Sequence, residues 1–272
     1  MSRRATLLIL GLLLAAAPPA AVAADFSVAG FFDFGGALAT HGTPWMRGSL
    51  DKLDDGGGGA GGAAPMIQGS ADMRLRLDTS FDAFATLRAA PNQHVPFDVL
   101  EAYGRYRWSA SSGWQGSVKL GAFFPPISLE NESVGWTSPW TLTPSAINSW
   151  VGDELRTIGG EANVEWRSGS RVIGLTGAVF GANDRAGALL ADRGWAFDSR
   201  LIGLLGEPRL PDATAIEIGK TPPLREQPFK EIDGTPGWYA GASLRQDDLG
   251  RIAVLYYDNI ADPGASSGND FG

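Results

Sequence analysis

The chain of 272 residues contains no cysteine and only two histidines, His41 and His94. Without cysteine it can form neither a disulfide framework nor a reactive thiol. Both histidines fall in predicted loops, whereas a membrane-embedded hydrolase of the Ser–His type needs a histidine on a strand beside its nucleophile. We therefore expect no catalytic residue, no metal ligand and no cofactor, and we do not expect an enzyme.

Long apolar runs are also scarce. The clearest one, residues 5–17, follows two arginines and precedes a pair of prolines and a stretch of small residues. It is shorter than the roughly 20 residues that a membrane-spanning helix needs, and its surroundings are typical of a secretory signal peptide. We expect residues 1–24 to be removed on export and residues 25–272 to form the mature part of the chain.

Basic residues are too few to balance the acidic ones. The chain has 22 lysines and arginines against 30 aspartates and glutamates, a formal net charge of −8. This negative charge argues against a nucleic-acid partner. Since no segment after the leader resembles a membrane-spanning helix, an exported chain that enters a membrane has to cross it with strands. The 37 glycines and 9 tryptophans are typical of β-barrels.

Apolar and polar residues alternate with a period of two along several segments, which is the pattern of strands with two different faces. Residues 70–78 are the clearest case, because Met73, Leu75 and Leu77 alternate with charged residues. The segments that we predict to be strands are 26–38, 70–78, 81–88, 100–108, 114–122, 158–166, 173–179, 238–245 and 252–258.

The connections between these strands alternate between tight and long. The tight ones are 78–80, 109–113, 167–169 and 247–250, and the long ones are 41–69, 90–97, 125–153 and 181–237. A transmembrane β-barrel alternates in this way, with short turns on the periplasmic side and longer loops outside. Trp108, Trp114 and Trp166 then lie at the periplasmic boundary of the lipid face, as an aromatic girdle requires. If they were instead core residues of a soluble sandwich, their common position would be a coincidence.

We predict an all-β fold, an antiparallel transmembrane β-barrel. Nine strands are an odd number, whereas bacterial barrels have an even one, and residues 262–272 have the composition of a loop. We therefore expect an incomplete N-terminal part of a larger even-stranded barrel, truncated at its C-terminus. Its structure should be an open, curved sheet with unpaired edges at the first and the last strand, and its leader should be a detached or loosely packed helix.

Charged residues gather on the face of the strands that would line the lumen. In one interpretation the arginines form a basic track that runs from the extracellular mouth through mid-depth to the periplasmic exit. Arg88 then lies at the mouth, Arg74 and Arg76 near mid-depth, and Arg105 and Arg107 toward the exit. In the other interpretation they pair with Asp72, Asp78, Asp82 and Glu101 and only brace neighbouring strands. The predicted pore-lining residues are Arg74, Arg76, Arg88, Arg105, Arg107, Lys119, Asp72 and Glu101.

The long connections carry features of their own. Residues 125–153 contain three tryptophans and either fold into the lumen or pack on the rim, and we expect an ordered loop in which residues 144–148 start a short helix. Residues 181–237 are too long for a plain connection, so we expect them to be functional, mobile or both. Asp51, Asp54 and Asp55 precede a run of glycines but lack the alternating ligands of a calcium loop, so we expect a flexible acidic loop.

Residues 118–130, with the sequence VKLGAFFPPISLE, are a strand followed by a Pro-rich loop with an acidic residue. With this segment, its leader and its alternating connections, the chain resembles Gram-negative outer-membrane porins and is most similar to the phosphate-selective porin O/P type and related porins. The resemblance implies a trimeric channel for small hydrophilic solutes. Phosphate-selective members line the pore with arginines and lysines, whereas here Asp72 and Glu101 share that wall.

We therefore expect a porin that is exported through the periplasm and lies in outer-membrane lipid. It would allow passive diffusion of small hydrophilic solutes or ions, and the sequence leaves open a preference for anions or phosphate. The alternative is a non-transporting outer-membrane barrel, either an adhesin or a structural protein. This alternative would have the same strand pattern, so conduction of ions is what distinguishes the two.

Overall fold

The computed structural model describes residues 24–39, 42–54, 56, 62–141, 143–198, 200–267 and 270–271. The expected signal peptide, apart from Ala24, lies outside the described residues, and so do His41 and Asp55. Among the described residues, no helix is both long and apolar enough to cross a membrane.

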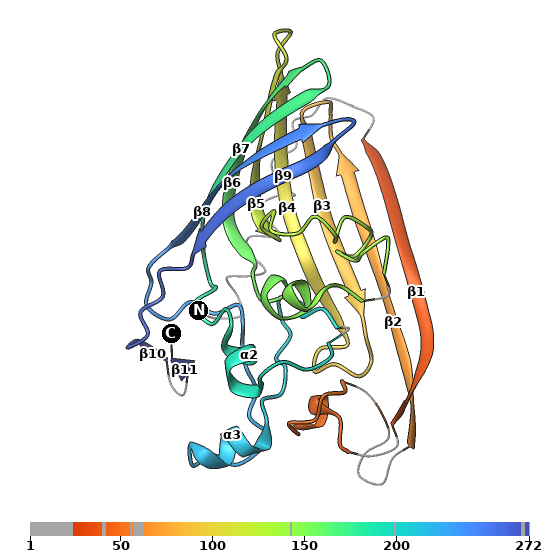
Figure 1. Cartoon of the computed structure of the whole chain (residues 1–272), viewed down its shortest axis with the longest axis vertical. Coiled ribbons are helices and arrows are strands. Elements are labelled where there is room, and N and C mark those ends of the chain that lie inside the picture. Colours follow the sequence, from red (N-terminus) through yellow and green to blue (C-terminus); the bar gives the residue numbers. More distant parts are fainter. Residues whose placement is uncertain are drawn as a thin grey trace.

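Nine strands form one antiparallel sheet in chain order, as predicted (Figure 1). Each strand pairs with the next, so tight turns gather at one end of the sheet and long connections at the other. The strands are β1 (Asp25–Ala39), β2 (Gly62–Arg76), β3 (Phe81–Ala89), β4 (Phe97–Ser109), β5 (Trp114–Phe123), β6 (Thr157–Ser168), β7 (Arg171–Gly181), β8 (Gly237–Gln246) and β9 (Gly250–Asp258).

The long connections contain short helical elements. A 3-10 turn, η1, covers Trp45–Arg47, and a π-helical turn, η2, covers Asn148–Gly152, close to where a short helix is expected. The connection between β7 and β8 contains α2 (Ala188–Arg193) and α3 (Asp212–Glu217). A separate two-stranded pair, β10 (Ser266–Ser267) with β11 (Asp270–Phe271), follows the main sheet.

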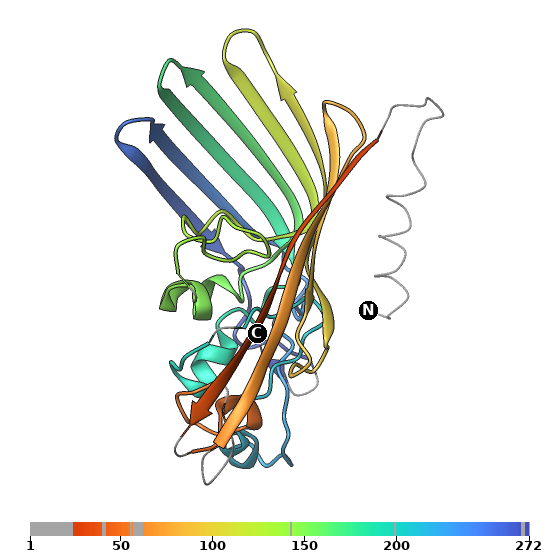
Figure 2. The same ribbon diagram turned by 90° about the vertical axis from the view of Figure 1, so that its right-hand side faces the viewer.

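The sheet has an apolar face and a charged face, because successive side chains of a strand point to opposite sides. On the apolar face Phe34 is 77% exposed and Val254 is 71% exposed, so this face is not a buried core. Figure 2 shows that the sheet is curved and that the folded connections gather on the side opposite this apolar face. We call the face that bears Asp82 and Arg105 the concave face, and the one that bears Phe34 and Val254 the convex face.

Two strands, β2 and β4, begin clearly earlier than the alternation predicts. β2 begins at Gly62 instead of residue 70, because residues 62–69 pair with the second half of β1. Glycines and alanines make up much of this extension, and they pair through their main chain without giving an alternating pattern. β4 likewise begins at Phe97 instead of residue 100. The predicted long connections 41–69 and 90–97 are therefore shorter than expected.

Leu100 lies on a different face from the one that its position in the alternation predicts. It is fully buried and packs with Phe124 and Leu201, which belong to the folded connections. The cause is a β-bulge, because the pairing of β3 with β4 shifts by one residue between Thr86 and Leu87. An extra residue in one strand changes the side to which its neighbours point.

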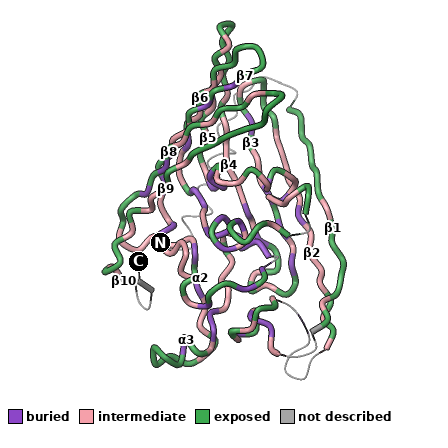
Figure 3. Tube along the Cα trace, in the orientation of Figure 1, coloured by how far each residue is buried: buried purple, intermediate pink, exposed green. Residues whose placement is uncertain are grey.

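The main apolar core lies between the long connections and not within the sheet (Figure 3). Trp45 and Trp150 pack with their ring centroids 5.9 Å apart, and each indole N–H donates a hydrogen bond to a main-chain carbonyl of residues 196–197. Three connections that are far apart in the sequence are therefore joined at the long-loop end. We call this the loop core, formed by Trp45, Trp150, Leu189, Ala196, Ile202 and Leu210.

Candidate functional site

The register of the sheet brings several predicted pore-lining residues into one row across the strands. Arg76 on β2 lies opposite Asp82 on β3, which in turn lies opposite Arg105 on β4. The row continues through Lys119 on β5 to Glu161 on β6. Side chains that face each other across antiparallel strands are about 5 Å apart at Cβ, so their charges interact. Over five neighbouring strands the row sets acids beside bases, except that Arg105 and Lys119 are neighbouring bases.

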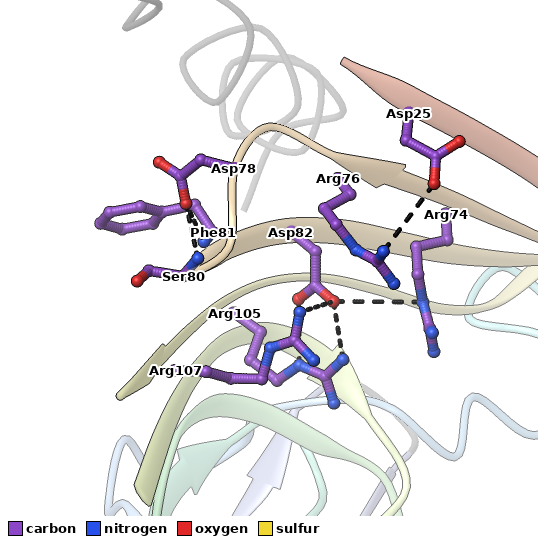
Figure 4. A network of polar contacts seen from close by, with 9 residues as sticks. All are labelled: Asp25, Arg74, Arg76, Asp78, Ser80, Phe81, Asp82, Arg105 and Arg107. Carbon is purple, nitrogen blue, oxygen red and sulfur yellow. Dashed lines mark hydrogen bonds and ion pairs between the residues drawn. The ribbon is translucent and has the colours of Figure 1, made fainter. Parts of the chain in front are cut away.

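Asp82 is the centre of a group of arginines that we call the Asp82 cluster, formed by Arg74, Asp82, Arg105 and Arg107 (Figure 4). Arg105 donates two hydrogen bonds to the carboxylate, from Nε at 3.0 Å and from Nη2 at 2.7 Å. The Asp82 Oδ2 atom also lies 3.4 Å from Arg107 and 4.0 Å from Arg74. The Asp82 side chain is fully buried, whereas those of Arg74 and Arg107 are 40% and 36% exposed. One carboxylate therefore holds three guanidinium groups, two of which reach the surface.

The surroundings of the cluster are positively charged. Arg76, beside it, forms an exposed ion pair with Asp25 at 3.8 Å. The four arginines of this region form ion pairs with two carboxylates, Asp82 and Asp25. Asp78 lies in the adjoining turn, where its carboxylate accepts the main-chain N–H groups of Ser80 and Phe81, and with it the region has an excess of one positive charge.

Arg88 lies at the long-loop end of β3, as the predicted order in depth requires, but the separate levels that we predict for the other arginines are wrong. Arg74, Arg105 and Arg107 meet at one carboxylate and do not lie at separate levels. The reason is that β2 ends at Arg76 and turns at once into β3, while β4 continues to Ser109 beside this turn. The bracing interpretation holds for Asp82, and the other acids of this wall take other partners.

Asp72 and Glu101 attach a long connection to the concave face. The Asp72 Oδ1 atom accepts hydrogen bonds from the Thr86 hydroxyl at 2.8 Å and from the Gly135 N–H at 3.1 Å. The Glu101 Oε1 atom accepts the Phe124 N–H at 2.9 Å. Both acids therefore hold residues 124–156, the connection between β5 and β6, against the strands.

The connection between β5 and β6 lies over the concave face of the sheet. Gly135 binds to β2, and Glu132 forms an ion pair with Arg251 on β9 at 3.6 Å. The second and the last strand of the sheet are thus linked by one short stretch of this connection. Trp136 stacks on Phe124 with ring centroids 3.9 Å apart and nearly parallel planes, which stiffens the stretch.

Two other predicted pore-lining residues, Arg88 and Lys119, already have interaction partners within the protein. Arg88 is buried and donates a hydrogen bond to Gln68 at 2.6 Å, with the acidic groups of Asp153 and Asp198 close enough to act on its charge. Lys119 forms an ion pair with Glu161 at 2.8 Å. Arg88 therefore lies beneath the folded connections, and Lys119 is neutralised within its row.

Buried charged groups join the connections to each other. Asp153 accepts the Ile202 N–H at 3.1 Å, Arg156 donates to the Ile202 carbonyl at 2.9 Å, and Glu154 accepts the Gly187 N–H at 2.8 Å. Burial disfavours the charged form of a group. It therefore raises the pKa of Asp153 and that of Glu154 to about 7, and it lowers the pKa of Arg156 to about 10.

The three tryptophans of the predicted girdle share one face and one end of the sheet. Trp114 on β5 lies opposite Trp166 on β6, with ring centroids 6.5 Å apart. Trp108 on β4 lies opposite Gly116, next to them on the convex face. All three belong to the tight-turn end and are partly exposed.

One group of acids has the spacing of a metal site. Asp184, Glu231 and Asp233 bring ligand atoms within 4.8 Å of one another. Their carboxylates also accept main-chain N–H groups of the surrounding loop. These hydrogen bonds give the three acids a structural role in the connection between β7 and β8.

Comparison with protein-family models, with curated proteins and with solved structures finds no match to this chain. The candidate site is therefore defined by geometry alone. It consists of the Asp82 cluster on the concave face and of the connection that crosses this face beside it.

Proposed function

We propose that the chain forms the wall of an outer-membrane porin, through which small hydrophilic solutes or ions diffuse passively. The observation that carries this proposal is the contrast between the two faces of one sheet. The convex face exposes apolar side chains and tryptophans, which lipid would cover. The concave face carries charged side chains that water would surround, and a folded connection lies across it.

The mechanism is selective permeation without a chemical step. Charged side chains along the path replace part of the hydration shell of a solute and set its preferred charge. Residues 124–156 narrow the path where they cross from β2 to β9, and the Asp82 cluster lies beside this crossing. Its excess of positive charge favours anions despite the acidic total of the chain, because low-dielectric walls focus the local field.

Single-channel recording tests the proposal. The full-length protein, reconstituted into a planar lipid bilayer, should conduct in discrete steps, and the reversal potential in a potassium chloride gradient should indicate a preference for chloride. A trimer, which the family resemblance implies, would close in three equal steps. A protein that inserts into the bilayer without conducting would instead be a non-transporting barrel, an adhesin or a structural protein.

Cell fractionation provides a simpler test. The mature protein should fractionate with the outer membrane and have a β-rich circular dichroism spectrum in detergent. Recovery of a soluble periplasmic monomer without detergent would contradict the proposal, because the apolar convex face would then need no lipid.

A further inference from the structure

An aromatic pair adjoins the Asp82 cluster on the concave face. Phe84 on β3 lies opposite Tyr103 on β4, with ring centroids 5.2 Å apart and planes inclined by 36°. Each ring is one step along its strand from the cluster, since Phe84 follows Asp82 and Tyr103 precedes Arg105 on the same face. Both residues are only partly buried. An accessible apolar surface therefore lies directly beside the guanidinium groups.

Two cations flank this pair, and only one of them is neutralised. The Lys119 Nζ atom lies 5.6 Å from the Tyr103 ring centroid and 2.8 Å from the carboxylate of Glu161. The Arg74 guanidinium lies 5.8 Å from the Phe84 ring centroid and reaches the Asp82 carboxylate only at 4.0 Å. Arg74 is thus a partly exposed cation beside an aromatic ring, and its charge is only partly balanced.

The cluster has more donors than its own carboxylate can accept. A guanidinium carries five N–H donors, and the oxygens of Asp82 accept two hydrogen bonds from Arg105. Among the described residues, the buried Nε atoms of Arg74 and Arg107 have no hydrogen-bond partner, and a solute can reach these two arginines only through the exposed parts of their side chains. Arginines with unused donors suit a second carboxylate, because the two oxygens of a carboxylate match the geometry of a guanidinium.

The spacing of the two features fits one small molecule. Same-face neighbours along a strand are about 7 Å apart, so a molecule with a carboxylate at one end and a ring at the other reaches both. Aromatic rings also attract each other in offset or tilted arrangements. An inorganic anion such as phosphate would use the arginines alone and would leave Phe84 and Tyr103 unused.

We propose that Arg74, Phe84, Tyr103, Arg105 and Arg107 form a recognition site for small carboxylates that carry an aromatic ring. This inference rests on the proposed function, since the site then lies on the path of the solute. The guanidinium groups bind the carboxylate, and the aromatic pair binds the ring. The site thereby selects aromatic carboxylates from other anions of the same charge.

Binding of 4-fluorobenzoate to the purified full-length protein in detergent, followed by fluorine NMR, tests the site directly. Phe84→Leu keeps an apolar side chain but removes the ring, and it should weaken binding about fivefold. Phe81→Leu is the matched control, because Phe81 forms the equivalent pair with Tyr106 on the convex face of the same two strands, with centroids 4.7 Å apart. Equal binding by wild type and the Phe84→Leu variant would overturn the inference.

Block of the chloride current in planar bilayers separates this inference from the proposed function. Benzoate should block at about a tenth of the concentration that acetate or phosphate requires, an order of magnitude that corresponds to one strong additional contact. If the protein conducts chloride but benzoate blocks no better than acetate, the recognition site is wrong and the porin stands. If the protein binds 4-fluorobenzoate through Phe84 but does not conduct, the porin is wrong and the binding site stands.

Discussion

The two ends of the concave face use arginine in opposite ways. At the long-loop end, Arg88 is buried beneath the folded connections and Arg156 is buried within one of them. At the tight-turn end, Arg74 and Arg107 remain partly exposed around a buried aspartate. Arg74, Arg88 and Arg107 all have their side chains on the concave face, so the face of the sheet does not explain why some are buried and others exposed. The cover that the long connections provide decides whether an arginine is buried in the fold or remains exposed.

The covered end depends on interactions that exclude water. Arg156 lies between the rings of Phe124 and Phe229, with its Cζ atom 3.5 Å and 4.9 Å from their centroids. Arg193 lies over Trp45 at 3.6 Å in the same way. Desolvation makes such cations costly unless charges, rings and hydrogen bonds surround them. The exposed end has no comparable cost, because its arginines retain contact with water.

Removing a covered arginine should have the largest effect. Arg156→Ala would remove a buried hydrogen bond to the Ile202 carbonyl and the contacts with the rings of Phe124 and Phe229, and we expect a loss of about 3–5 kcal/mol in the free energy of unfolding. Arg76→Ala, which breaks an exposed ion pair with Asp25, should cost less than about 1 kcal/mol. Urea unfolding of both variants in detergent measures the difference. Equal losses would show that the loops do not bury the charges at the covered end.

The covered end should also depend on pH. The pKa of Asp153 and that of Glu154 are raised to about 7 in the folded protein. The folded state binds the proton of such a carboxyl group more tightly than the unfolded state does. This stabilises the folded state fully when the pH is below the ordinary pKa of the group, and the stabilisation is lost as the pH rises through the raised pKa, about 7. We expect the stability of the covered end to fall between about pH 4 and pH 8, because each unit by which a pKa is raised corresponds to about 1.4 kcal/mol.

Protease resistance of the connection between β7 and β8, measured over this range of pH, tests that expectation. Asp153→Asn and Glu154→Gln should each flatten the dependence, because the amide does not titrate. Asp233→Asn is a suitable control, since main-chain hydrogen bonds to an exposed carboxylate lower the pKa of Asp233. An unchanged slope in both buried variants would contradict the assignment.

The exposed end should control which ions pass. Arg74→Ala combined with Arg107→Ala removes the two exposed cations of the Asp82 cluster, and we expect the chloride-to-potassium permeability ratio to fall about two- to threefold. Arg171→Ala is the control. Arg171 also lies at the tight-turn end, but its side chain is on the convex face, where it donates a hydrogen bond to Gln246. Reversal potentials in a salt gradient give the ratio. An unchanged ratio in the double variant would mean that these arginines only brace the strands.

The smallest effect should come from the tryptophans of the tight-turn end. Trp114→Ala removes one partner of an exposed aromatic pair, so the loss in unfolding free energy should be about 1 kcal/mol. The loss should be greater in lipid vesicles than in detergent, because indole rings favour the membrane interface. Unfolding of the same variant in both media tests this. An identical loss in the two would argue against contact with the lipid interface.

The sheet could be predicted because its physics is local. Alternation along 70–78 or 158–166 reflects a strand with one apolar and one polar face, and the strands lie there in the predicted order. The extension of β2 over residues 62–69 could not be predicted in this way, because small residues pair without a pattern. The bulge that turns Leu100 inward depends on the register between two strands, which no single strand encodes.

The candidate site was predictable in its residue types and not in its arrangement. Arg74, Arg105 and Arg107 stand out in the alternation, but their meeting at Asp82 requires the register of three strands. Phe84 occupies a polar position of its strand and therefore looks like an exception to the pattern until Tyr103 is placed opposite it. The covered residues Asp153 and Arg156 lie at the end of a connection, where no periodic pattern exists.

The meander also sets an order of assembly in time. Every pairing within the nine-stranded sheet joins strands that are consecutive in the sequence. Contacts between residues that are close in the sequence form fast, so each hairpin can add to the one before it. The loop core instead joins Trp45, Trp150 and Leu210, which are far apart in the sequence. The core therefore cannot close until the connection after β7 has arrived, and the arginines beneath it stay hydrated until that moment.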